Sequence, residues 1–190
     1  MAGHVVLVGL MGSGKTTVGR RLAARLARDF IDADVALAEI TDRTIADIFA
    51  TDGEAAFRAI EADVLKDLLE HHTPSVIASG GGVVVTSESR VRLADPAVTV
   101  VWLDASPAFL ASRIEQREHR PLLAGDESAR DVLGRLHAER APLYAEVADI
   151  VVDVEPFHRD AEKPKKALAE RIEHLVRHHE ASSEPSEARR

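Results

Sequence analysis

Short runs of apolar residues alternate along this chain with longer stretches in which apolar residues recur every three or four positions. The short runs predict buried strands at 5–8, 76–78, 98–103 and 150–152, with a shorter candidate at 30–31. The longer stretches predict helices at 15–28, 34–40, 44–50, 54–71, 87–94, 107–118, 127–145 and 160–179. Alternating strands and helices build βαβ units. The pattern therefore predicts a three-layer α/β/α fold with a five-stranded parallel sheet.

Composition narrows the class of protein. A length of 190 residues suits one domain, which we place at 1–179, and the Ser/Glu/Arg-rich stretch 180–190 is predicted to be a disordered tail. The absence of cysteine excludes disulfides and thiolate metal sites. A net charge of −8 argues against a nucleic-acid surface, and no apolar run is long enough to span a bilayer. We therefore expect a cytoplasmic protein with neither nucleic-acid nor membrane partners.

Residues 9–16 carry the most specific motif in the chain. Gly9-x-x-Gly12-x-Gly14-Lys15-Thr16 matches the P-loop pattern, and it lies between an apolar strand and an amphipathic helix, as that pattern requires. The glycines let successive backbone N–H groups face an anion. Lys15 is then placed for the β- and γ-phosphates and the Thr16 hydroxyl for Mg²⁺. A purely structural turn is the alternative, but the strand–loop–helix order favours a nucleotide phosphate site.

Two further polar or glycine-rich segments follow predicted strands. Asp32 and Asp34 come after 30–31, and Gly80-Gly81-Gly82 comes after 76–78. Ligands bind at the carboxyl ends of parallel strands, so both segments are predicted to lie near the P-loop. In an extended stretch the two carboxylates point the same way, and they can divide metal binding from substrate binding. The alternatives are that Asp34 only caps a helix and that the glycines form a bulge or linker.

Arginines supply candidate anion ligands. Arg58 lies beside the apolar stripe of the predicted helix 54–71, and Arg140 lies in the predicted helix 127–145. The segment 114–126 contains Pro121, Gly125 and Arg120, which is typical of an exposed lid. Guanidinium groups bind carboxylate and phosphate bidentately. Any single arginine is more often a solvated surface residue, and spacing alone does not select these.

Taken together, these blocks resemble the shikimate kinase family. The resemblance rests on the P-loop, Asp32-Ala-Asp34, Phe57-Arg58-x-x-Glu61, the glycine triplet, Arg120-Pro-Leu-Leu and Arg140-x-x-x-Tyr144, and it covers about 1–155. It implies ATP- and Mg²⁺-dependent phosphorylation of the 3-hydroxyl of shikimate, in aromatic amino-acid biosynthesis. It also implies a nucleoside-monophosphate-kinase-like fold with a substrate-binding region at about 33–61 and a lid at about 114–126. We expect a monomer whose partners are shikimate and ATP.

The resemblance also implies a role for each matching residue. Catalysis would rest on Asp34, Lys15 and Arg120. ATP would be held by Gly12, Ser13, Gly14, Lys15, Thr16, Thr17, Arg113 and Arg120, with Arg113 against adenine. Shikimate would be held by Asp34, Arg58, Gly80, Gly81, Gly82, Arg140, Phe49, Phe57 and Glu61. Mg²⁺ would be bound by Thr16 and, through water, by Asp32.

The chain departs from the family pattern after its last predicted strand, where the segment 154–159 is hard to align and the adenine contact is left open. The predicted strand 76–78 also lacks an aspartate of the Walker-B type. The alternatives are a gluconokinase, a nucleoside monophosphate kinase or a nucleotide-binding switch. The Arg58, Arg140 and Asp34 set suits a hydroxy acid better than a nucleobase. A GTPase would normally carry Asn-Lys-x-Asp, which the sequence lacks.

Overall fold

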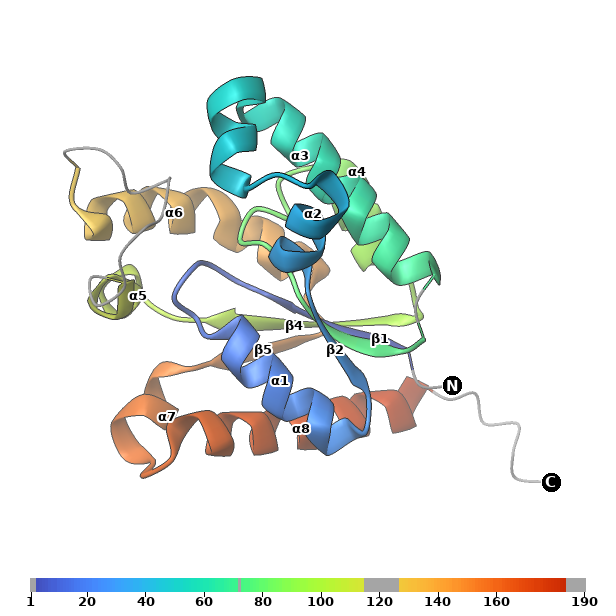
Figure 1. Cartoon of the computed structure of the whole chain (residues 1–190). Coiled ribbons are helices and arrows are strands. Elements are labelled where there is room, and N and C mark those ends of the chain that lie inside the picture. The colour runs from blue at the N-terminus through green and yellow to red at the C-terminus, as the bar shows by residue number, and fades with distance from the viewer. Residues whose placement is uncertain (1–2, 72, 115–126, 184–190) are drawn as a thin grey trace.

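The computed structural model describes residues 3–71, 73–114 and 127–183 (Figure 1). Its centre is a five-stranded, fully parallel sheet in the order β2-β3-β1-β4-β5. The strands are β1 His4–Val8, β2 Asp29–Asp32, β3 Ser75–Ala78, β4 Val98–Asp104 and β5 Ile150–Asp153. All five residues of β1 are buried, as expected for a central strand covered on both faces. The predicted fold class is therefore confirmed.

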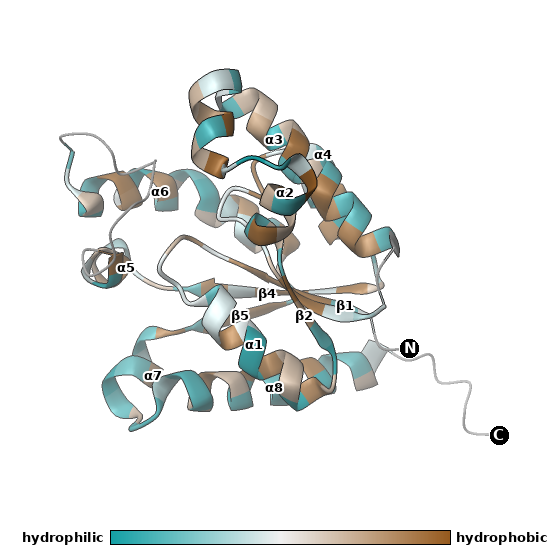
Figure 2. Cartoon of the chain, viewed as in Figure 1, coloured by the Kyte–Doolittle hydropathy of each residue, from teal (hydrophilic) through white to brown (hydrophobic). Residues whose placement is uncertain are grey.

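Helices cover both faces of the sheet (Figures 1 and 2), and the residues that α1 and α8 bury are mainly apolar. Helices α1 and α8 pack together on one face, while α3, α4 and α6 lie over the other. The bounds are α1 Lys15–Leu26, α2 Ala33–Thr41, α3 Ile45–His71, α4 Ser87–Leu93, α5 Pro107–Ile114, α6 Ala129–Val147, α7 Glu155–Asp160 and α8 Pro164–Ser183. None of the helices within the described ranges is long and apolar enough to cross a bilayer.

The predicted helices 44–50 and 54–71 are the two segments of α3, which is kinked at Gly53, where φ is 80° and ψ is 176°. Two details differ from the sequence-based expectations. A short helix, α7, lies where no helix was predicted. Helix α8 continues through Ser183, so the prediction of a disordered tail is wrong for 180–183, where Glu180 pairs with Arg28 at 2.7 Å. The remaining tail and the predicted lid beyond Ile114 lie outside the described residues.

The strand order explains why distant motifs meet. Strand β3 lies between β1 and β2, and all three strands run the same way. Their carboxyl ends therefore lie side by side. The P-loop after β1, the aspartates at the end of β2 and the glycine turn after β3 then share one edge of the sheet.

Candidate active site

A cavity of about 610 Å³ opens at this edge of the sheet. Its walls come from the P-loop, α3, the glycine turn, α5 and α6. It brings together most of the predicted site residues: Gly12, Gly14, Lys15, Thr16, Thr17, Asp32, Asp34, Phe49, Phe57, Arg58, Glu61, Gly80, Gly81, Gly82, Arg113 and Arg140. Ser13 is buried inside the loop and is not part of the wall. Arg120 lies outside the described residues.

The P-loop adopts a conformation that depends on glycine. Gly12 and Gly14 have φ values of 87° and 100°, which other L-residues rarely adopt, and Gly14 forms the N-cap of α1. Lys15 Nζ donates to the carbonyl oxygens of Gly9 at 2.7 Å and Leu10 at 3.2 Å. A positively charged amine therefore lies over the loop at the start of a helix. This combination favours a phosphate group.

Thr16 and Asp32 form a small oxygen-rich corner. The Thr16 hydroxyl donates to Asp32 Oδ2 at 2.8 Å, and Asp32 Oδ1 accepts from the Asp34 backbone N–H at 3.2 Å. Hydroxyl and carboxylate oxygens are the donors that Mg²⁺ prefers, and that ion commonly takes its other ligands from water and phosphate. These side chains therefore fit the predicted ion.

The two aspartates do not share an extended segment, as the sequence pattern suggested. Helix α2 begins at Ala33, so Asp32 ends β2 and caps α2 with its side chain, whereas Asp34 lies in the first helical turn. The alternative that Asp34 is the cap is therefore wrong. Both carboxylates still face the same cavity.

Arg58 lies in a buried cluster of charges on α3. Its Nη1 donates to Glu61 Oε2 at 2.6 Å, and both side chains are only 8% exposed. Burial lowers the pKa of Arg58, but the charges and hydrogen bonds of Glu61 and Glu54 outweigh it, and the net shift is upward. Burial raises the pKa of Glu61 against the lowering effect of Arg58. Arg58 also lies 5.0 Å from the centre of the Phe57 ring, which stacks on Phe49.

The glycine turn is held by α6 on its other side. Arg140 Nη1 donates to the Gly81 carbonyl oxygen at 3.0 Å, and the Tyr144 hydroxyl donates to the same atom at 2.5 Å. Burial raises the pKa of Tyr144, so its phenol keeps the proton that it donates. The Tyr144 ring also packs against Trp102 at 5.5 Å. The sequence motif contained Tyr144, but nothing in the local pattern indicated this contact.

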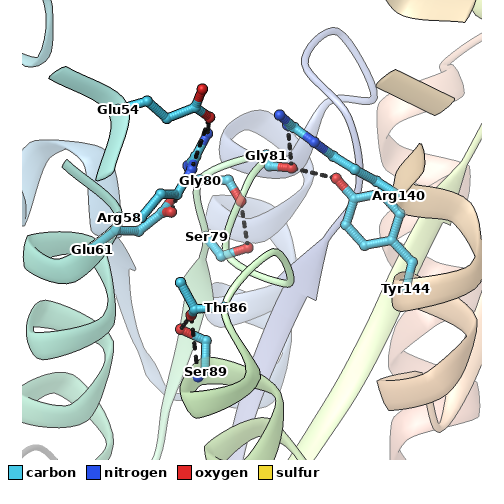
Figure 3. A network of polar contacts seen from close by, with 10 residues as sticks. All are labelled: Glu54, Arg58, Glu61, Ser79, Gly80, Gly81, Thr86, Ser89, Arg140 and Tyr144. Atoms are coloured by element: carbon cyan, nitrogen blue, oxygen red, sulfur yellow. Dashed lines mark hydrogen bonds and ion pairs between the residues drawn. The ribbon is translucent and has the colours of Figure 1, made fainter. Parts of the chain in front are cut away.

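Space, rather than backbone conformation, requires glycine in the triplet. None of its three residues has a positive φ. A Cβ at Gly82 would lie within 2.5 Å of the Arg58 guanidinium, and one at Gly80 would lie 3.0 Å or less from the carboxylates of Asp34 and Glu61. The close approach that the triplet predicted is therefore to protein side chains, and the ligand-facing role of the turn stays a prediction. Figure 3 shows the result, with Arg58 and Arg140 reaching in from α3 and α6 on opposite sides of the turn.

Comparison with known proteins agrees with this geometry. The family model for shikimate kinase matches residues 11–176. The chain belongs to the shikimate kinase family. The shikimate kinase of Paramagnetospirillum magneticum is 48% identical over 149 residues, which cover 78% of this chain and 74% of the relative. That of Mycobacterium bovis is 49% identical over 153 residues, covering 80% and 85%.

Solved structures of shikimate kinases share the fold. The structure from Acinetobacter baumannii in complex with shikimate superposes with a TM-score of 0.84 at 34% identity and covers 94% of this chain and 95% of that one. The structure from Bacteroides thetaiotaomicron gives a TM-score of 0.83 at 28% identity, covering 92% and 98%. This shikimate kinase family member is therefore a P-loop kinase in both sequence and fold.

The segment that the sequence left unassigned lies near Arg113. Arg113 Nε donates to the Gly12 carbonyl oxygen at 3.0 Å, and its guanidinium lies 5.4 Å from the Phe109 ring centre. His158 of α7 packs edge-on against the same ring at 5.4 Å. Lys165 of α8 also lines the cavity. His158 and Lys165 were not among the predicted site residues, because the chain after β5 carries no recognisable motif.

Proposed function

We propose that the protein transfers the γ-phosphoryl group of ATP to the 3-hydroxyl of shikimate and so supplies shikimate 3-phosphate for aromatic amino-acid biosynthesis. The observation that carries this proposal is the pair of buried arginines, Arg58 and Arg140, on opposite sides of the glycine turn. A small carboxylate needs cations of this kind, and a bidentate guanidinium is the usual partner. The pair lies in the same cavity as the P-loop.

Binding and positioning would be shared between the two ends of the cavity. Lys15, the amides from Gly12 to Thr17 and the start of α1 would hold the phosphates, and Arg113 would lie against adenine. Arg58, Arg140 and the Gly81 N–H would hold the shikimate carboxylate end, with Phe49, Phe57 and Glu61 shaping the pocket. Holding both reactants in line converts an encounter in solution into a reaction within one complex.

Asp34 is the group we assign to the attacking alcohol. Its carboxylate lies beside Gly80 and the Glu61 carboxylate, within the cavity and close to the P-loop side. In the proposed step the 3-hydroxyl oxygen bonds to the γ-phosphorus, its proton passes to Asp34, and the bond to the bridging oxygen breaks to release ADP. A positioned carboxylate of this kind orients the nucleophile in phosphoryl transfer.

Charge on the transferred group must also be neutralised. Thr16 and Asp32 would hold Mg²⁺, which neutralises charge on the β- and γ-phosphate oxygens when bound. Arg120 stays a prediction for the lid. The monomeric state also stays a prediction.

One coupled assay tests the proposal against its alternatives. ADP release is measured with Mg²⁺–ATP and one of four acceptors: shikimate, gluconate, AMP or none. We expect release only with shikimate. Release with gluconate or AMP would identify a different kinase, and hydrolysis independent of any acceptor would favour a nucleotide-driven switch.

A further inference from the structure

Arg58 has two anionic partners that differ in burial. Glu61 takes Nη1 inside the protein, where its side chain is 8% exposed. Glu54 takes the other edge of the guanidinium, and one oxygen, Oε1, accepts from Nη2 at 3.0 Å and from Nε at 3.3 Å. The Glu54 side chain is 56% exposed. The guanidinium therefore has an inner partner and an outer partner (Figure 3).

The edge of the guanidinium that Glu54 covers is one that suits a ligand carboxylate. A guanidinium binds a carboxylate in a bidentate manner through two parallel N–H groups on one edge. Glu61 occupies the Nη1 side, and Gly82 lies so close to the guanidinium that no ligand fits between them. The Nε/Nη2 edge offers two parallel N–H groups away from Glu61, and Glu54 lies on it.

From these contacts we infer that Glu54 is an internal stand-in for the substrate carboxylate, which the substrate must displace; the inference rests on the proposed function. Without a ligand, Glu54 stays paired with the outer edge of the buried Arg58 guanidinium. This contact reduces the free-energy penalty of burying an unpaired charge. With a ligand, three carboxylates around one guanidinium would repel one another, so Glu54 leaves. Glu54 therefore weakens the binding of every carboxylate acceptor.

The local backbone lowers the free energy needed to displace Glu54 from Arg58. Glu54 follows Gly53, where the left-handed φ of 80° interrupts α3 and starts a new helical segment. A carboxylate in the first turn of a helix is stabilised by the helix dipole. When Glu54 leaves Arg58, its charge stays at that favourable position and enters solvent. Glu61, which is buried in the middle of the segment, has no such alternative.

Calorimetric titration of shikimate without nucleotide tests the inference. Glu54→Gln keeps the size of the side chain and removes its charge, and we expect the Kd to fall about two- to fivefold, the range for an exposed ion pair. Asp67→Asn removes one charge from an exposed position on the same helix and should leave the Kd unchanged. Methyl shikimate, which has no carboxylate, should bind Glu54→Gln and wild type equally.

The outcomes separate this inference from the proposed function. An equal or higher Kd for shikimate in Glu54→Gln, in a wild-type protein that phosphorylates shikimate, overturns the role of Glu54 alone. The inference is also overturned if Asp67→Asn lowers the Kd for shikimate by the same factor, or if Glu54→Gln lowers the Kd for methyl shikimate by that factor. Either result would mean that the change in net charge, and not the Glu54–Arg58 contact, affects binding. If wild type neither binds nor phosphorylates shikimate, the proposed function fails, and this inference fails with it.

Discussion

Replacing Gly82 with alanine would place a methyl group where the Arg58 guanidinium now lies. The added Cβ would fall within 2.5 Å of Nη1, Cζ and Nη2. Ordinary contact begins at about 3.4 Å, so either the guanidinium or the turn must shift by about 1 Å. The side chain cannot swing away cheaply, because Glu61 holds Nη1 at 2.6 Å in a buried position.

A shift of that size acts on substrate binding more than on folding. Misplacing a positioning group by about 1 Å can cost about 100-fold in rate, which corresponds to about 2.7 kcal/mol of transition-state stabilisation. We therefore expect kcat/KM for shikimate to fall by about that factor in Gly82→Ala. The KM for ATP should stay near the wild-type value, because the three atoms nearest to this methyl group all belong to Arg58.

The assay is steady-state ADP release with shikimate and ATP varied separately. Gly134→Ala is the matched control, since it also adds one methyl group, but on α6, where no atom of the described residues outside the helix's own backbone lies within 4 Å of the new Cβ. Its kinetics should equal those of wild type. If Gly82→Ala retained kcat/KM for shikimate within about threefold, the close packing of Arg58 on the turn would not control substrate positioning, and our reasoning from that contact would be refuted.

Three further predictions address the nucleophile, the turn and pH. Asp34→Asn should lower kcat by orders of magnitude with little change in the KM for ATP, and near-normal turnover would remove Asp34 from the chemistry. Tyr144→Phe removes one donor to the Gly81 carbonyl, so kcat/KM for shikimate should fall about fivefold, the equivalent of one net hydrogen bond; unchanged kinetics would contradict a positioning role. Burial lowers the pKa of His158 below its usual 6.5, so the unfolded chain binds this proton more readily and the unfolding free energy should fall as the pH drops below about 6.5. Measured by urea unfolding, the free energy of unfolding should fall less with decreasing pH in His158→Gln than in wild type. In the exposed control His174→Gln it should fall as much as in wild type.

Local sequence patterns predicted most of the fold because the sheet is buried on both faces. Such strands are almost entirely apolar, and strand β1 is buried along its whole length. The break between the predicted helices 44–50 and 54–71 is confirmed, and it lies at Gly53. Helix α7 was missed because a helix of six residues carries little periodicity. Its Pro156 lies in the first turn, where proline is well tolerated.

Local sequence patterns predicted less of the site than of the fold. The P-loop could be recognised because all of its parts lie within one short segment. The contact of Arg140 and Tyr144 with the Gly81 carbonyl joins residues that are 59 and 63 positions apart, and it depends on how α6 packs over the sheet. Family resemblance selected Arg58 and Arg140, whereas spacing alone did not. The position of Glu54 on Arg58 required side-chain geometry.

Trp102 is the only tryptophan in the sequence, and it packs on Tyr144, whose hydroxyl contacts the glycine turn. A ligand that binds in the cavity and moves this turn would therefore change the environment of the Trp102 indole. The protein thus has an intrinsic fluorophore two contacts away from the acceptor pocket. Ligand titrations and rapid-mixing experiments can use its emission without any attached label, and a variant such as Tyr144→Phe would test whether the optical signal travels through this route.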